Sequence, residues 1–230
     1  MPVILTIDAS SSLCSVALDT GTELNWSTED QPRRHAQRLL PMVDELLADS
    51  GISKNSLDGV AFGRGPGSFT GIRIAVAVAH GLSLGLDIPV CGISALEAIA
   101  LAASRESDEQ QFLTLMDAHM GEVFWGAFQR EGNLVHPISA EHVSAPEACI
   151  DALSSFTGTV AGDGLQLTPF EAYISDGLII RPEARVMAAL AAREWQSGGF
   201  GEPEEHSPVY LRQSVAWKKI DEQPSLLKRS

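Results

Sequence analysis

The feature that most constrains the fold of this 230-residue chain is a weak internal repeat, in which one pattern of strands occurs twice. An apolar, β-branched run at residues 3–8 ends in an aspartate, and residues 112–117 have the same form. Each run is followed by a polar turn, a second apolar stretch (14–18 or 123–128) and a turn that contains glycine. This pattern is typical of a β-hairpin. The sequence therefore predicts two copies of one β-meander, beginning about half a chain apart.

Segments with helical spacing follow the first meander. Between residues 36 and 48, apolar side chains recur every three or four positions, which predicts a helix with one broad apolar stripe. Because proline removes a helix-interior hydrogen bond, this helix is expected either to begin near Leu40 or to be kinked at Pro41. Further helices are expected over residues 72–84, 96–103 and about 186–196.

Strands and helices alternate in both halves of the chain, which predicts an α/β protein of two similar lobes. Residues 104–111 form a polar break after the helix at 96–103, so we place the boundary between residues 1–105 and residues 106–230. With 44% hydrophobic residues, the chain is long enough to give each lobe a core.

The charge balance limits the partners that the chain can hold unaided. Sixteen basic residues against thirty acidic ones leave a formal net charge of −14, which repels polyanions. A protein that binds RNA alone needs a basic face, and only short basic clusters occur here. They are Arg33-Arg34 with Arg38, Lys218-Lys219 and Lys228-Arg229. We interpret them as solvated surface, so tight RNA binding by the isolated chain is not expected.

The location of the protein is predicted from what the sequence lacks. No stretch reaches the unbroken apolar length of roughly 18 residues that a membrane span needs, and the first residues do not resemble a signal peptide. The three cysteines, Cys14, Cys91 and Cys149, are scattered and form no metal or redox pair. We expect buried, reduced thiols, a cytoplasmic location and no membrane association.

A glycine-rich segment at residues 63–71 stands directly before the helix expected at 72–84. Backbone amides at a helix start can hold anions. This segment is not a Walker motif, however, because no lysine stands in the required place and Pro66 removes one amide. The favoured interpretation is a turn that needs glycines, with Ser68 or Thr70 capping the helix. Arg73 is then available for a salt bridge.

Residues 4–18 and residues 65–74, which include Gly-Pro-Gly-Ser-Phe-Thr-Gly, resemble the two signatures of the TsaB family, also called YeaZ. The glycine-rich segment is a specific signal, whereas the other similarities would be weak alone. Those other similarities are at residues 35–42, 117–124 and 208–212, so the resemblance spans nearly the whole chain.

The resemblance implies the two-lobed, ribonuclease H-like fold of the actin, sugar kinase and Hsp70 superfamily. It also implies two partners: TsaD, a homologue that carries the transfer chemistry, and the small ATPase TsaE. In that family the TsaB-type subunit makes TsaD competent to transfer a threonylcarbamoyl group to adenosine 37 of transfer RNA. It has no cofactor of its own, because ATP or ADP and Mg belong to TsaD. Transfer RNA is then bound only through the complex, and whether a nucleotide lies at the joint surface stays open.

The two helices of the first lobe form the contact surface in that family, used for a heterodimer with TsaD or a homodimer when TsaD is absent. The helix at 72–84 offers apolar or small residues nearly all round, so one of its faces needs a partner. Ala75 and Ala79 would let two backbones approach closely. The expected interface residues are Leu39, Leu40, Val43, Leu47, Ile72, Arg73, Ala75, Val76, Ala79 and His80.

A nucleotide site in this chain is the first alternative. In ATP-using members of the superfamily, an aspartate at the end of the first strand helps to hold the metal ion, and hydroxyl side chains in the next turn approach the phosphates. A lone acid at a strand end is more often a turn-stabilising residue. The candidate nucleotide-binding residues are Asp8, Ser10, Ser11, Ser12, Gly65, Gly67 and Ser68.

A metallopeptidase is a weaker alternative. Two histidines one helical turn apart are the usual zinc-binding pair, and the six histidines of this chain contain no such pair. The TsaD-like homologue has a His-x-x-x-His pair where this chain has Ser94 to Ala98. No metal site is therefore expected, and the serine-rich turn is not a nucleophile elbow. The favoured interpretation is a non-catalytic subunit, with a solitary actin-like ATPase or kinase as the alternative.

Overall fold

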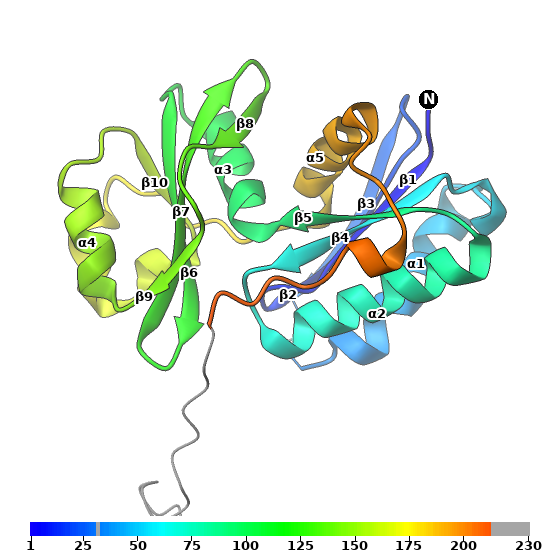
Figure 1. Cartoon of the computed structure of the whole chain (residues 1–230), viewed down its shortest axis with the longest axis horizontal. Helices are drawn as coiled ribbons and strands as arrows, with labels where there is room; N and C mark the ends of the chain where they lie inside the picture. Colours follow the sequence, from blue (N-terminus) through cyan, green and yellow to red (C-terminus); the bar gives the residue numbers. More distant parts are fainter. Residues whose placement is uncertain (31–32, 213–230) are drawn as a thin grey trace, which may run out of the picture.

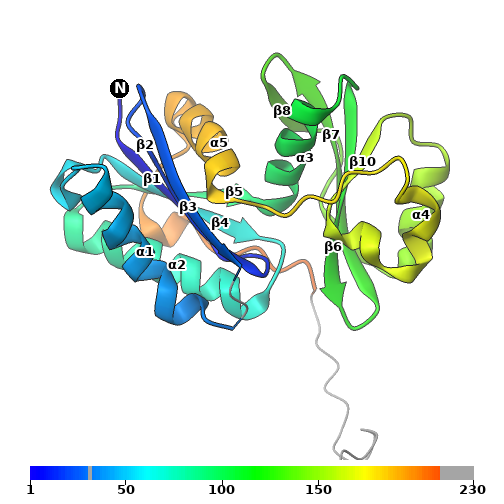
Figure 2. The ribbon, with the colours of Figure 1, turned by 180° about the vertical axis from the view of Figure 1, so that it is seen from behind.

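A computed structural model describes residues 1–30 and 33–212 of the chain (Figure 1). The basic clusters at 218–219 and 228–229 lie outside the described residues. Two lobes stand side by side, each built on its own twisted β-sheet (Figures 1 and 2). The prediction of a two-lobed α/β protein is confirmed.

The first sheet begins with an antiparallel meander of β1 (Ile4–Asp8), β2 (Leu13–Asp19) and β3 (Leu24–Asp30). The chain then crosses over so that β4 (Gly59–Gly65) pairs parallel to β1 and β5 (Val90–Ser94) pairs parallel to β4. The resulting strand order is β3-β2-β1-β4-β5.

The second sheet repeats this plan. An antiparallel meander of β6 (Gln111–His119), β7 (Glu122–Glu131) and β8 (Leu134–Pro137) is followed by β10 (Thr159–Ala161), which pairs parallel to β6. The short β9 (His142–Ser144) pairs with β7. The order β10-β6-β7-β8 therefore matches β4-β1-β2-β3 of the first sheet, and the predicted duplication of the meander is confirmed.

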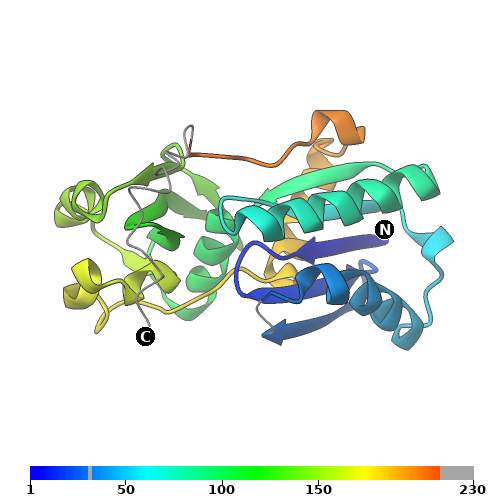
Figure 3. The same ribbon diagram turned by 90° about the horizontal axis from the view of Figure 1, so that it is seen from below.

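Helices cover both faces of the first sheet. On one face, α1 (His35–Asp49) and α2 (Phe69–Leu86) lie beside each other (Figure 3). Side chains such as Leu5 and Ile7 point from β1 into the core beneath these two helices. On the other face lies α5 (Ala184–Ser197). Because both faces are covered, all five residues of β1 are buried.

The second lobe has α3 (Ala95–Glu106) on one face of its sheet and α4 (Pro146–Ser154) on the other. Helix α3 also contacts α5, so one core runs across the junction of the lobes. The remaining described elements are short 3-10 helices. They are Lys54–Ser56, Asp163–Gln166, Thr168–Tyr173 and Pro203–Glu205.

The lobes are not two consecutive parts of the chain. The boundary expected between residues 105 and 106 falls at the end of α3. That boundary assigns α5 to the second lobe, whereas α5 packs on β1 and β2 of the first lobe. The chain after α5 returns along the first lobe, where Gly201 bridges to Val90 and Val209 N–H donates to Arg64 O, and it reaches the second lobe at Arg212, which pairs with Glu122 of β7. The reason is that the apolar side of α5 covers a sheet face that no other helix protects.

Two helices begin earlier than the sequence predicts. Helix α1 starts at His35 and runs through Pro41, so of the two alternatives for this helix the start near Leu40 is wrong. Helix α2 starts at Phe69 rather than Ile72, because the Ser68 side chain accepts a hydrogen bond from Gly71 N–H at 3.2 Å. This bond satisfies one of the free amides at the helix start. The predicted cap at Ser68 is confirmed.

Candidate functional site

A cavity of about 620 Å³ lies where the two lobes face each other. The first lobe supplies the β1–β2 turn at residues 10–12 and the starts of α1 and α2, while the second supplies the end of β6 and Asp163. Several candidate nucleotide-binding residues meet at this cavity: Ser10, Ser11, Ser12 and Ser68 line it. Asp8, Gly65 and Gly67 are not among its lining residues.

Asp8 is sealed behind the serine turn. Its side chain has no solvent exposure, Oδ1 accepts a hydrogen bond from Ser10 N–H at 3.1 Å, and Oδ2 has no partner. A Cβ atom at Gly63 would lie 2.0 Å from Oδ1, so only glycine fits beside this carboxyl. Burial raises the pKa of Asp8 to about 7. This position suits a turn-stabilising residue better than a metal ligand facing the cavity.

The glycine-rich loop presses directly on the backbone after β1. A Cβ atom at Gly67 would lie 2.2 Å from Ser10 O, and one at Gly71 would lie 1.8 Å from Ala9 O. Gly65 and Gly67 also have positive φ angles, of 98° and 153°. Ser68 N–H donates to Ser10 O at 2.7 Å, so this amide is already used inside the protein. The loop is therefore a close-packed turn and cap, as favoured from the sequence.

The wall from the second lobe is acidic. Asp117 near the end of β6 accepts from His119 N–H at 2.7 Å and pairs with the His119 ring at 3.1 Å. Asp163 lies after β10, and its Oδ1 is buried without a partner. Burial, with a smaller contribution from the charge of Asp117, raises the pKa of Asp163 above its ordinary value. Asp163 was not among the residues predicted from the sequence. A signal was present, because Gly162-Asp163-Gly164 follows β10 and Gly63-Arg64-Gly65 ends β4, the strand of the first sheet that corresponds to β10.

Most of the expected interface residues face inward. Six of the ten are buried in this chain alone, where they pack on the first sheet or its neighbouring helix, so they cannot contact a partner. They are Leu39, Val43, Leu47, Ile72, Ala75 and Ala79. Leu40 and Arg73 are exposed, and Val76 and His80 are partly buried. The expectation that Ala75 and Ala79 form the outward row of small residues is therefore wrong, because that row faces the sheet.

A different row of small residues faces outward on α2. Ala77, Gly81 and Gly85 are exposed and four residues apart, and a Cβ atom at Gly81 or Gly85 would meet nothing within 4 Å. The exposed side chains of Leu84 on α2 and Leu40 on α1 add apolar surface to this region. Only five of the eighteen α2 residues are buried. The helix thus has an outward face that permits close approach of another backbone.

Arg73 does not form the expected salt bridge within the described residues. Its guanidinium carbon lies 3.4 Å from the centre of the Phe69 ring, and its Nε donates to the Tyr210 hydroxyl at 2.9 Å. Phe69 remains 55% exposed. The arginine therefore makes a cation–π contact within the start of α2 and ties it to the C-terminal part of the described chain through the hydrogen bond to Tyr210.

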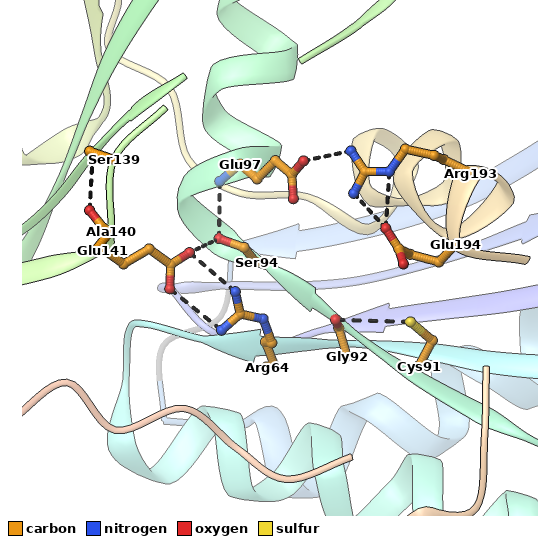
Figure 4. Close-up of polar contacts among 10 residues, drawn as sticks. All are labelled: Arg64, Cys91, Gly92, Ser94, Glu97, Ser139, Ala140, Glu141, Arg193 and Glu194. Atoms are coloured by element: carbon orange, nitrogen blue, oxygen red, sulfur yellow. Dashed lines mark hydrogen bonds and ion pairs between the residues drawn. The ribbon is translucent and has the colours of Figure 1, made fainter. Parts of the chain in front are cut away.

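Polar side chains join the lobes around the end of β5 (Figure 4). Arg64 on β4 pairs with Glu141 at 3.4 Å, and the Ser94 hydroxyl also donates to Glu141. Arg193 on α5 pairs with Glu97 on α3 at 2.6 Å. Ser94 and Ala98 stand where the TsaD-like homologue has its His-x-x-x-His pair. In this chain Ser94 caps α3 and Ala98 is buried in the core.

The three cysteines each lie in a hydrophobic core. Cys14, Cys91 and Cys149 are free and buried, as expected, and burial raises the pKa of each thiol to about 12. Within residues 1–30 and 33–212, no group of three or more histidine, cysteine or acidic side chains is arranged to hold a metal ion.

The chain is similar to known proteins over almost its whole length. A family model described as "TsaD: tRNA N6-adenosine threonylcarbamoyltransferase" matches residues 28–165. The chain is 39% identical over 225 residues to the tRNA threonylcarbamoyladenosine biosynthesis protein TsaB of Escherichia coli (strain K12), covering 94% of this chain and 97% of that protein. It is 38% identical to the TsaB protein of Haemophilus influenzae, covering 94% and 96%.

Solved structures agree with these sequence relatives. A Pseudomonas aeruginosa protein described as similar to peptidase YEAZ superposes with a TM-score of 0.82 at 37% identity, covering 92% of this chain and all of that one. YeaZ from Pseudomonas aeruginosa superposes with a TM-score of 0.79 at 33% identity and the same coverage. The sequence match, the duplicated meander and the glycine-rich turn lead to one conclusion: the chain belongs to the TsaB (YeaZ) family.

Proposed function

We propose that this protein is a non-catalytic subunit in the biosynthesis of threonylcarbamoyladenosine in transfer RNA, and that it acts by pairing with a TsaD-like catalytic subunit. The observation that carries the proposal is the outward face of α2, which is apolar, rich in small residues and uncovered by residues 1–30 and 33–212. The names of the TsaB relatives place those proteins in the same biosynthesis.

The composition of α2 supports a partner rather than solvent on this face. By length and composition alone, α2 is the one described helix that could cross a membrane. It nevertheless packs on the first sheet through Ile72 and Ala75, and Arg73 and His80 interrupt its apolar run. Apolar surface of this extent on a sheet-packed helix is typical of a protein–protein interface.

The geometry favours a helix pair as the partner. With Ala77, Gly81 and Gly85 four residues apart, a second helix can approach the α2 backbone closely, and α1 with α2 supplies half of a four-helix bundle. A TsaD-like homologue with the same fold would supply the other half across a pseudo-two-fold axis. A second copy of this chain would do so across a true two-fold axis when that partner is absent.

The other members of the complex then carry the chemistry. ATP or ADP and Mg belong to the TsaD-like subunit, and a TsaE-like small ATPase completes the machinery, all in the cytoplasm. A net charge of −14 favours transfer RNA binding through the complex rather than through this chain alone. The alternative of a solitary ATPase or kinase is less well supported, because Asp8 is sealed and Ser68 N–H is already bonded to Ser10 O.

The test is Gly81→Glu, compared with the matched control Gly81→Ala. A Cβ atom at Gly81 meets no atom of the described residues within 4 Å, and both alanine and glutamate favour a helix over glycine by about 0.5–1 kcal/mol, so both variants should fold at least as stably as the natural protein. Gly81→Glu places an unpaired charge in the proposed interface. We expect it to weaken binding of the TsaD-like subunit about a hundredfold or more and to abolish tRNA modification in a reconstituted reaction.

Binding is measured by light scattering and by pull-down, and folding by circular dichroism. We expect Gly81→Ala to retain most of the partner binding. A folded Gly81→Glu protein that still binds its partner at full affinity would place the interface on another surface. ATP turnover by the isolated chain that is lost in Asp8→Ala would instead support the solitary enzyme.

A further inference from the structure

The described chain passes between the two lobes three times. It leaves the first lobe where β5 continues into α3 at Ser94, returns through residues 178–184 to α5, and reaches the second lobe again along residues 209–212 (Figures 1 and 2). Movement of one lobe against another is absorbed by the backbone angles of a few residues in such crossings. The contacts at the three crossings therefore decide whether the lobes can move.

The first crossing carries a polar network that joins both lobes (Figure 4). Both terminal nitrogens of Arg64 on β4 lie 3.4 Å from the Glu141 carboxylate, each at a different oxygen. Glu141 lies between β8 and β9 of the second sheet, and its side chain is only 13% exposed. Ser94, in the crossing itself, donates to the same carboxylate and accepts from Glu97 N–H at 3.1 Å. The network thus connects the first sheet, the crossing and the second sheet.

A second arginine reinforces this crossing from α5. Arg193 Nη1 donates to the Glu97 carboxylate on α3 at 2.6 Å and to Val135 O on β8 at 3.1 Å. The Glu97 side chain is only 10% exposed. Hydrogen bonds between charged groups that are shielded from water are strong, and loss of one partner leaves the other charge buried. Helix α5 of the first lobe is therefore fastened to two elements of the second.

Arginines also hold the other two crossings. At the second crossing, Arg181 donates to Ser12 Oγ at 2.6 Å and to the Asp30 carboxylate at 3.0 Å, both in the first lobe. At the third crossing, Arg212 Nε donates to Glu122 on β7 at 2.7 Å. An arginine–carboxylate pair thus stands at each place where the described chain passes between the lobes.

The apolar contacts at the junction do not fix the angle between the lobes by themselves. Helices α3 and α5 pack on each other there within one core. Apolar packing is non-directional, and packed helices can slide past each other by small amounts. The planar fork of an arginine, in contrast, binds a carboxylate in a defined orientation. The polar pairs therefore add the directional restraint that the core lacks.

We propose that these arginine–carboxylate pairs form a latch that holds the two lobes at one angle. The latch consists of the pairs Arg64–Glu141, Arg193–Glu97, Arg181–Asp30 and Arg212–Glu122, and Arg64–Glu141 is its main element. Many two-lobed enzymes complete their sites by closing the lobes around a substrate. A latched junction gives a scaffold with a fixed lobe angle instead.

The latch assigns a second role to the glycine-rich segment, which contains Arg64. A Cβ atom at Gly92 on β5 would lie 3.0 Å from Arg64 Cβ, so glycine at this position leaves room for the arginine side chain. The inference concerns this chain alone and does not depend on the partner interface of α2.

The experiment measures the distance between the lobes in the full chain. Spin labels are attached at Asp49→Cys on α1 and Asp151→Cys on α4, which are both exposed, while the three natural cysteines are buried. Double electron–electron resonance gives the distribution of distances between the labels, and dilution with unlabelled protein removes signals between copies. We expect one narrow distribution in the natural background. In Glu141→Ala we expect a shift of about 2 Å or more, or a clear broadening.

A matched control separates the latch from a general loss of stability. Glu29→Ala breaks the ion pair with Arg38, whose half-buried partners both lie in the first lobe. It should lower the stability of the protein and leave the distance distribution unchanged. Glu122→Gln breaks the more exposed pair at the third crossing, so it should fold even if Glu141→Ala does not, and it should broaden the distribution to a smaller extent. Circular dichroism checks folding.

Two results would overturn the inference. The first is a distance distribution in the folded latch variants that coincides with the natural one, which would mean that the apolar junction alone holds the lobes. The second is equal broadening in Glu29→Ala and in the latch variants, which would mean that any lost ion pair loosens the protein.

Discussion

Asp8 and Asp117 occupy the same place in the two lobes, near the end of the first strand of each meander, yet their surroundings are opposite. Asp8 is fully buried with one oxygen unpartnered, whereas the Asp117 side chain is 36% exposed and paired with His119. The difference arises from the turn at the end of each strand. The serine turn folds Ser10 over Asp8, while β6 has a register shift between Asp117 and His119 and opens toward the cavity.

The helices that cover the two sheets also differ in how much of their surface is buried. Helix α3 of the second lobe has nine of its twelve residues buried, between its own sheet and α5. Helix α2 of the first lobe has five of eighteen buried, and its other residues are half-buried or exposed. The helix of the second lobe is therefore largely covered within the chain, whereas the helix of the first lobe keeps an exposed face. The two sheets share one strand order, and the elements that cover them decide which lobe keeps an exposed helix face.

The largest expected effect concerns the inward row of α2. Ala75→Glu places a charge in the core between α2 and the first sheet, and we expect it to lower the free energy of unfolding by roughly 5 kcal/mol, enough to unfold the first lobe. The measurement is urea unfolding followed by circular dichroism. Ala77→Glu is the control, since Ala77 is exposed on the same helix. Equal stability of the two variants would contradict the assignment of the two faces.

The next effect distinguishes the two aspartates through pH. The pKa of Asp8 is about 7 in the folded chain against an ordinary value of 3.8, so between these values the folded state holds a proton that the unfolded state has lost. Raising the pH through this window therefore lowers the free energy of unfolding, in total by roughly 4 kcal/mol, and above pH 7 this loss is complete.

Asp8→Asn should remove that slope and make the protein more stable than the natural one at pH 8. Asp117→Asn should change the slope little, because Asp117 is partly exposed and paired. Urea unfolding between pH 4 and pH 8 measures both. An unchanged slope in Asp8→Asn would show that the carboxyl reaches solvent.

The smallest effect concerns the helix caps of the two lobes. The Ser68 side chain caps α2, whereas α4 begins after Ala145 with no side-chain cap. Ser68→Ala should therefore cost about 1 kcal/mol, and Ala145→Ser should add up to about 1 kcal/mol. Thermal unfolding checks both. Equal and opposite changes in the free energy of unfolding would mean that the cap contributes the same stability in both lobes. A much larger loss of stability in Ser68→Ala would mean that Ser68 also holds the glycine-rich loop in place.

The sequence alone determined the parts of this protein that depend on local chemistry. The alternating apolar runs predicted both meanders, and Ser68 predicted the cap of α2, because side-chain period and capping act between near neighbours. The glycine-rich turn identified the family, since its glycines are required by backbone contacts with Ala9 and Ser10.

Only the tertiary structure decided which face of α2 is inward. The helix is apolar or small nearly all round, so its pattern does not separate Ala75 and Ala79, which pack on the sheet, from Ala77 and Gly81, which face outward. The return of α5 to the first sheet and the position of Asp163 opposite Ser10 also depend on contacts between distant parts of the chain. A local pattern contains no information about such contacts, because packing of whole elements sets them.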